Sequence, residues 1–325
     1  MIGSVMPTLN ARPTPLDNRH PILRGGAVAA LPSEVDLRAF CPPVGNQLTY
    51  GSCTAWATKG LAESLQLIQG KPLTLLSADF PWALERELEG TFPQNVGAMP
   101  GDTMLIGHTE GFCTEAEMPY ATTPITVLPN PTQRAAALAY RFGAYWRMVQ
   151  EAGTTPEEIL APLMARLAAG FTTTTGFQVY DNFFATGSNG LVPMPGSSSI
   201  DGGHDTLCCG YSHNVPGAPA GSLWFLHENQ WGDRWGMNGY FWLPAEFMVE
   251  PTLVSDMWTA QPVTANDPNV PVGKVVSVNW AGQPLAQGGV IVGGRTWVEL
   301  IEVATADSKH ATYYPDASPP FVGVE

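Results

Sequence analysis

The sequence predicts an α+β protein in which helices come first along the chain and strands come later, so that the two kinds of element form two lobes. Residues 53–70 carry apolar side chains at three- and four-residue spacing and end at a glycine, which is typical of an amphipathic helix. Residues 155–158, Thr-Pro-Glu-Glu, form a capping box with proline at the first helical position. Beyond residue 171, short runs rich in threonine and aromatic residues predict strands.

Local signals place the other elements in chain order. Ser77 is expected to cap a second helix that Gly90 ends, and residues 121–133 have the composition of a Thr/Pro linker. Helices are expected at residues 53–70, 77–90, 102–110 and 155–170. Strands are expected at residues 171–180, 206–211, 222–228 and 239–243.

The length of 325 residues allows one large domain and a small one. Residues 1–30 contain several prolines and predict an extended arm, which we expect to pack on the surface or to contact a partner. Residues 31–258 form the main domain, and residues 259–273 have the Pro/Asn composition of a linker. Residues 274–325 alternate apolar and polar positions, which predicts a small, mainly β appendage.

Charge and hydropathy exclude several classes of protein. The net charge is −14 and the pI is near 4.7, which argues against nonspecific binding to nucleic acid or to an anionic membrane. Residues 1–26 lack the apolar core of a signal peptide, and no run of about 18 apolar residues predicts a membrane span. We therefore expect a cytoplasmic protein, or one that reaches a particle or the cell exterior without a cleavable signal.

The five cysteines and six histidines show no spacing typical of a metal site, so no metal or other cofactor is expected. Cys208 and Cys209 are adjacent in an expected strand, and their side chains should point to opposite faces and not pair. A disulfide between Cys41 and Cys113 remains open.

Cys53 is the strongest candidate for a reactive residue. It lies at the start of the predicted helix 53–70, where the helix dipole would lower the pKa of the thiol and favour the nucleophilic thiolate. Gln47, six residues earlier, could stabilise an oxyanion together with the backbone N–H of Cys53. A single cysteine on a helix is also often a small buried core residue.

Three motifs in order resemble those of papain-like cysteine peptidases: residues 32–57, residues 202–207 (Gly-Gly-His-Asp-Thr-Leu) and residues 229–240 (Asn-Gln-Trp-Gly…Gly-Tyr). In that family the histidine and asparagine follow the cysteine by about 130–150 residues. The spacings here are 204 − 53 = 151 and 229 − 53 = 176, and the longer one fits an enlarged hairpin at residues 214–222.

This resemblance covers residues 32–258 and implies a papain-like fold with a helical lobe and an antiparallel β lobe. It implies a cysteine endopeptidase acting on protein or peptide substrates. Cys53 would be the nucleophile, His204 its proton carrier, Asn229 the residue that orients His204, and Gln47 an oxyanion donor. Trp231 matches the tryptophan that shields the His–Asn hydrogen bond from water in the family.

Several positions depart from the family pattern. Thr54 replaces the aromatic residue that follows the nucleophile, and Leu48 replaces a glycine, so the loop after Gln47 is expected to run differently. Tyr50 replaces a cysteine, which removes a usual disulfide. Asp205 would raise the pKa of His204 if its carboxylate lay near the ring.

Two other functions remain open. One is an acyltransferase or transpeptidase that uses the same Cys-His-Asn set. The other is a structural or attachment component of a larger assembly, such as a viral particle, with partners held through residues 1–30 and 274–325. Residues 293–300, Gly-Gly-Arg-Thr-Trp-Val-Glu-Leu, resemble copper-amine-oxidase-like stalk modules, which would imply an accessory role without copper chemistry. The arm is too short and proline-rich for the helical inhibitory pro-domain found in many family members.

Overall fold

The computed structural model describes residues 8–16, 19–23, 31–148 and 154–263, and beyond these only short strands between residues 275 and 324. The chain divides into two compact units, Met1–Thr264 and Ala265–Glu325. The described residues of the second unit are all in strands. Residues 264–273 of the predicted linker 259–273, and most of residues 293–300, lie outside the described residues. These strands are β8 (Val275–Val276), β9 (Asn279–Trp280), β10 (Gln283–Pro284), β11 (Gly289–Val292), β12 (Arg295–Trp297), β13 (Ala311–Tyr314) and β14 (Phe321–Val324).

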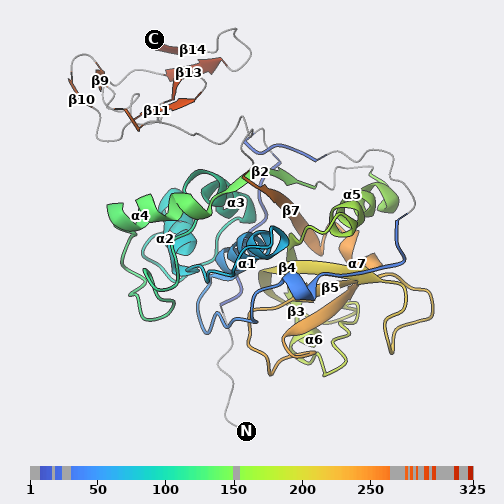
Figure 1. Ribbon diagram of the computed structural model, residues 1–325. Coiled ribbons are helices and arrows are strands. Elements are labelled where there is room, and N and C mark those ends of the chain that lie inside the picture. The colour runs from blue at the N-terminus through green and yellow to red at the C-terminus, as the bar shows by residue number, and fades with distance from the viewer. Residues whose placement is uncertain are drawn as a thin grey trace. The chain divides into compact units, whose positions relative to one another are not determined.

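The first unit begins with a helical lobe, which Figure 1 shows as the blue and green helices beside the sheet. Its helices are α1 (Cys53–Ile68), α2 (Asp79–Leu88), α3 (Pro100–Thr109) and α4 (Pro131–Ala137), with short 3-10 turns at Arg38–Phe40 and Leu138–Tyr140. Gly70 and Gly90 follow α1 and α2 with φ of +69° each, so both predicted helix ends are confirmed. Helix α4 was not predicted, although Asn130 and Gln133 form a capping box within the sequence expected to be a linker.

The second lobe is an antiparallel sheet of seven strands with three helices on or beside it. The strands are β1 (Glu34–Asp36), β2 (Phe142–Arg147), β3 (Thr173–Tyr180), β4 (Ile200–Ser212), β5 (Trp224–Glu228), β6 (Tyr240–Pro244) and β7 (Val254–Pro262). They follow the order β2-β7-β3-β4-β5-β6, and β1 also pairs with β4. The helices are α5 (Pro156–Ala168), α6 (Asp181–Phe184) and α7 (Ala245–Met248). The predicted α+β fold with two lobes is therefore confirmed.

Helix α1 packs between the two lobes and joins them. Its predicted apolar face is buried, and Leu61 and Leu65 share a core cluster with Leu207 of β4 and Trp258 of β7. This shared core places α1, and hence Cys53 at its N-terminus, against the sheet.

The structure corrects one expectation about the chain and answers one open question. Residues 259–262 were assigned to a linker, but they continue β7, and both Thr259 and Ala260 are fully buried between β2 and β3. The disulfide between Cys41 and Cys113, which the sequence left undecided, is absent, because both residues are free thiols. Cys41 instead interacts with Cys209. No helix in the described part of the chain is long and apolar enough to cross a bilayer.

Candidate active site

Cys53 is the first residue of α1, as the sequence predicted, and its side chain has no exposed surface. The backbone N–H groups of Asp205 and Thr54 lie where they would stabilise a thiolate at this position. Asp205 is the residue after His204 on β4, so the sulfur of Cys53 lies against the segment of the sheet that carries the histidine. The helical lobe thus contributes Cys53, and the β lobe contributes His204.

His204 and Asn229 form a hydrogen bond of 2.9 Å between Nε2 and Oδ1, and both residues are buried. The same Oδ1 atom accepts a hydrogen bond from the backbone N–H of Gln230 at 2.9 Å, which identifies it as the amide oxygen. Nε2 of His204 must therefore donate its proton to Asn229. A neutral His204 then carries a lone pair on Nδ1, an atom that is buried and has no hydrogen-bond partner.

Gln47 is held beside this pair by backbone and side-chain contacts. Its N–H donates to the carbonyl of Gln230, and its Nε2 donates to the carbonyl of Tyr50 at 2.8 Å. The Oε1 atom accepts from Nε1 of Trp231 at 3.2 Å, and the Trp231 ring lies 5.0 Å from the His204 ring, centroid to centroid. Trp231 therefore contacts both the imidazole and the glutamine that the sequence singled out.

The positions that depart from the family pattern have structural explanations. Leu48 has a φ of 55°, the left-handed conformation that favours glycine, and its N–H donates to Oδ1 of Asn46. Thr54 is buried and its hydroxyl donates to the carboxylate of Glu85. Tyr50 packs against the ring of Trp82 instead of forming a disulfide. The loop after Gln47 thus accepts Leu48 by adopting the strained backbone conformation that glycine would adopt freely.

The electrostatics of Cys53 and His204 differ from the expectation. Burial raises the pKa of the Cys53 thiol to about 12, with a further rise from the charge of Asp205. Burial lowers the pKa of His204 to about 4, despite the hydrogen bond to Asn229. The predicted lowering of the Cys53 pKa by the helix dipole is therefore outweighed, and burial favours a neutral Cys53 thiol and a neutral His204 imidazole in this structure.

Asp205 is buried, and its charge acts on Cys53 and not on His204. Burial raises its own pKa well above the ordinary value, with further contributions from Asp256 and Glu85. The backbone N–H groups of Thr206 and Thr175 partly offset that rise. The charge of Asp205 affects the pKa of Cys53, and it is not among the groups that shift the pKa of His204. Asp205 therefore does not raise the pKa of His204 in this structure.

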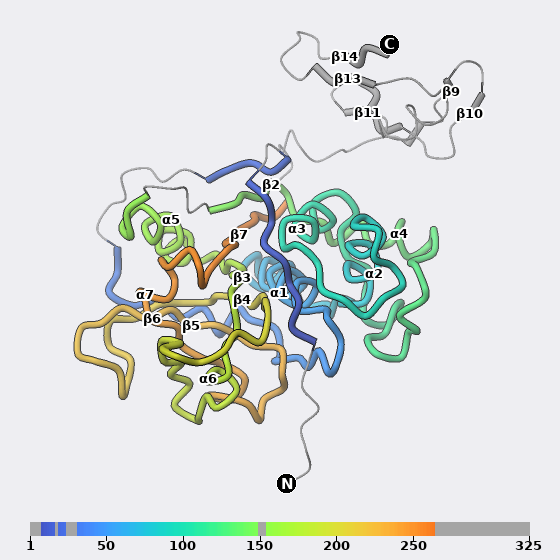
Figure 2. The backbone as a smooth tube through the Cα atoms, turned by 180° about the vertical axis from the view of Figure 1, so that it is seen from behind, coloured from blue at the N-terminus to red at the C-terminus, as the bar shows by residue number. Residues whose placement is uncertain are grey.

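The N-terminal arm packs beside His204. Figure 2 shows it as the dark blue tube that runs between the helical lobe and the sheet. The N–H of Ala11 donates to the carbonyl of Gly203 at 3.1 Å, and the N–H of Arg12 donates to the carbonyl of Ala98 at 3.0 Å. The arm therefore packs against the protein with hydrogen bonds to both lobes beside His204. Contact of the arm with a partner stays a prediction.

The walls along the arm are lined by glycines, which allow a backbone to approach closely. A Cβ atom on Gly202 or Gly203 would lie 2.0 Å from a carbonyl oxygen of the arm, and one on Gly97 would lie 2.4 Å from the carbonyl of Asn10. Gly51, two residues before Cys53, is similarly close to the Asn10 side chain. The sequence analysis missed this track, although the Gly-Gly pair before His204 was a visible signal of it.

Among the described residues, no group of three or more His, Cys, Asp or Glu side chains is arranged to hold a metal ion. The chemistry that the site can support is that of a thiol, an imidazole and amide groups. The protein has two lobes, a buried cysteine at a helix N-terminus and a His–Asn pair. These features together define a thiol-dependent hydrolase of the acyl-transfer class.

Comparisons with known proteins agree with this class. Residues 31–251 match the sequence model of the papain family of cysteine proteases, so the chain belongs to that family. An uncharacterized peptidase C1-like protein of Acanthamoeba polyphaga mimivirus is 29% identical over 223 residues, covering 67% of this chain and 70% of that protein. Human cathepsin L2 is 26% identical over 219 residues, covering 65% of this chain and 60% of that protein.

Among solved structures, xylellain, a cysteine protease from Xylella fastidiosa, superposes with a TM-score of 0.69 at 28% identity. The match covers 79% of this chain and 97% of xylellain. The chain is therefore a cysteine-type peptidase with a papain-like fold, and a purely structural role is not favoured.

Proposed function

We propose that this protein hydrolyses peptide bonds through an acyl-enzyme on Cys53, with His204 as proton carrier, Asn229 as the residue that orients it and Gln47 as an oxyanion donor. The observation that carries the proposal is the direction of the hydrogen bond from Nε2 of His204 to Oδ1 of Asn229. This direction leaves a lone pair on Nδ1 of His204, so Nδ1 is the atom able to take a proton from the thiol.

The reaction follows from these roles. The Cys53 thiol transfers its proton to Nδ1 of His204, and the thiolate attacks the substrate carbonyl carbon. The oxyanion that forms accepts hydrogen bonds from the Cys53 N–H and the Gln47 amide, where one such donor is typically worth about 3 kcal/mol. His204 then protonates the leaving amine, and water, activated by the same imidazole, hydrolyses the thioester.

An extended peptide is the substrate that the glycine track supports. Gly51, Gly97, Gly202 and Gly203 leave room for a main chain on both walls, and the arm shows that an extended backbone fits there. The arm must move out before a substrate can bind, and its departure admits water to Cys53 and His204. Water reduces the burial penalty on both charged forms, which favours the thiolate–imidazolium pair over the neutral pair.

The test is covalent labelling by an epoxysuccinyl inhibitor followed by peptide mapping. We expect labelling at Cys53 in the intact chain and faster labelling in Arg12→Ala/Arg19→Ala, which loosens the arm. Cys53→Ala should abolish labelling and turnover, whereas Cys113→Ala, which removes another buried free thiol, should retain both. Absence of labelling at Cys53 in both chains would overturn the proposal.

Mass spectrometry of the products separates hydrolysis from acyl transfer. If the enzyme hydrolyses peptides, the main product is a free carboxylate even when competing amines are present at millimolar concentration. A new amide as the main product would instead identify an acyltransferase or transpeptidase that uses the same residues.

A further inference from the structure

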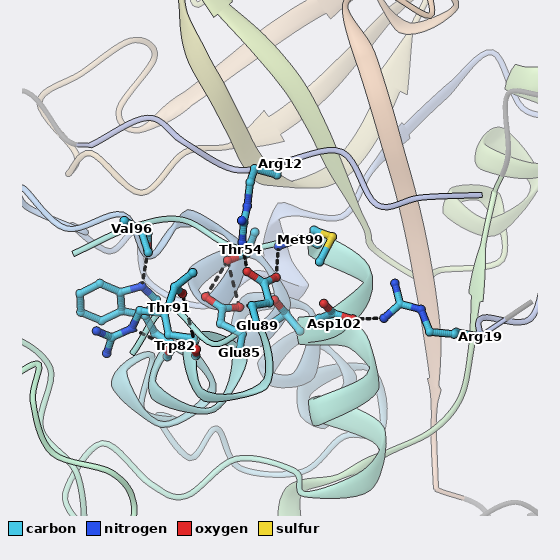
Figure 3. Close-up of polar contacts among 12 residues, drawn as sticks. Arg12, Arg19, Thr54, Trp82, Glu85, Glu89, Thr91, Val96, Met99 and Asp102 are labelled. Carbon is cyan, nitrogen blue, oxygen red and sulfur yellow. Dashed lines mark hydrogen bonds and ion pairs between the residues drawn. The ribbon is translucent and has the colours of Figure 1, made fainter. Parts of the chain in front are cut away.

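Glu89 lies just beyond the end of α2 and faces the arm from the helical lobe, as Figure 3 shows. Its side chain is only 3% exposed. Oε1 accepts the backbone N–H of Met99 at 2.7 Å, and Oε2 receives the guanidinium of Arg12. The carboxylate is therefore nearly buried, fixed by a backbone hydrogen bond, and directed at one cation.

Arg12 occupies a position that a substrate residue would take. Its backbone N–H donates to the carbonyl of Ala98 on one wall, while the N–H of the preceding residue, Ala11, donates to Gly203, next to His204. The Arg12 side chain thus leaves an extended backbone beside the catalytic histidine and reaches Glu89. Its guanidinium stands in for a basic group on a bound peptide.

We infer that Glu89 forms the floor of a subsite that selects an arginine or lysine side chain in the substrate. The inference rests on the proposed peptidase function of this cleft. Among the described residues, Arg12 is the one cation that the structure pairs with Glu89. When the arm leaves, a nearly buried carboxylate loses its partner, and a substrate guanidinium or ammonium restores it.

A neutral side chain in the same place would leave the carboxylate unpaired. A substrate with an acidic side chain there would add repulsion between like charges. The sequence alone gave no sign of this subsite, because Glu89 and Arg12 are 77 residues apart.

The experiment uses fluorogenic peptides that carry either arginine or citrulline, which is neutral and has nearly the same shape. The residue is placed in turn at each of three positions before the scissile bond and at one position after it. The chain used is Arg12→Ala, which frees the subsite. At one position we expect kcat/KM to favour arginine by about tenfold or more, because a hydrogen bond to a charged group is stronger than one to a neutral group.

Glu89→Gln in the same chain should reduce that preference to about twofold or less. Glutamine keeps an oxygen for the Met99 N–H, and Glu89→Asp, which keeps the charge, should retain a preference for arginine. Glu87→Gln is the matched control, since Glu87 lies on the same helix with its side chain 44% exposed. It should not alter the preference.

The outcomes separate this inference from the proposed function. Equal turnover of arginine and citrulline peptides at every position, or a preference that survives Glu89→Gln, would overturn the subsite and leave the peptidase intact. Failure to cut any peptide, together with no epoxysuccinyl labelling of Cys53, would overturn the proposed function and the subsite with it.

Discussion

Replacing Glu85 with glutamine tests how the interior behind the nucleophile responds to pH. Glu85 on α2 has no exposed surface, and its carboxylate accepts hydrogen bonds from the hydroxyls of Thr54 and Thr103. Figure 3 shows Thr54 directed at this carboxylate. Burial raises the pKa of Glu85 from its ordinary 4.5 to about 7, although the two hydroxyls partly offset that rise.

The sign of the effect follows from proton binding in the two states. Between pH 4.5 and 7 the folded chain holds a proton on Glu85 that the unfolded chain has released, so stability falls as the pH rises. The pKa difference of about 2.5 corresponds to roughly 3 kcal/mol of unfolding free energy, lost by about pH 8. Glutamine does not titrate, so Glu85→Gln should match the unsubstituted chain at pH 4 and exceed it by about 3 kcal/mol at pH 8.

Urea unfolding followed by tryptophan fluorescence at pH 4, 6 and 8 measures the difference. Glu87→Gln, on the exposed side of the same helix, serves as the control and should change the pH dependence little. A difference between Glu85→Gln and the unsubstituted chain that stays constant from pH 4 to 8 would refute the reasoning. It would mean that Glu85 is as well solvated in the folded chain as in the unfolded one.

Two further predictions concern the site and the chain end. Asn229→Ala should reduce kcat/KM less than His204→Ala does, because His204 carries the proton, and proton transfer usually contributes about 10²–10⁴-fold to the rate. Equal losses in steady-state assays would remove Asn229 from its orienting role. A chain ending at Thr264 should stay soluble and cut small peptides, but it should lose any attachment made through the appendage. A chain ending at Thr259 should be less stable, because it lacks Ala260, which pairs with β2 and whose carbonyl accepts a hydrogen bond from Arg166. Expression, thermal unfolding and turnover of the two chains check this, and equal stability would show that the end of β7 is dispensable.

Local sequence signals were sufficient for many elements of the fold. The capping box at Thr155 is present as predicted, with Thr155 and Glu158 bonded to each other's backbone N–H groups. Gly70, Gly90 and Gly170 all adopt positive φ after a helix, as the sequence indicated. Such signals are readable because each depends on residues within one or two turns of each other.

Strands were harder to predict where their partners are distant. Strands β2 and β7 were missed, and β7 pairs with residues more than 70 positions away on both sides. Their composition is not distinctive, so only the sheet shows that residues 259–262 belong to it. The end of the folded unit therefore could not be placed from the linker-like composition alone.

The sequence by itself determined the family and the fold, through the order of Cys53, His204 and Asn229 and their local motifs, and it predicted that these residues carry the chemistry. Only the tertiary structure decided the state of that chemistry. It buries both groups, and burial raises the pKa of Cys53, opposite to the effect expected from the helix dipole, and lowers that of His204. The physical reason is that solvation depends on every segment packed around a group, whereas a motif records only its neighbours along the chain.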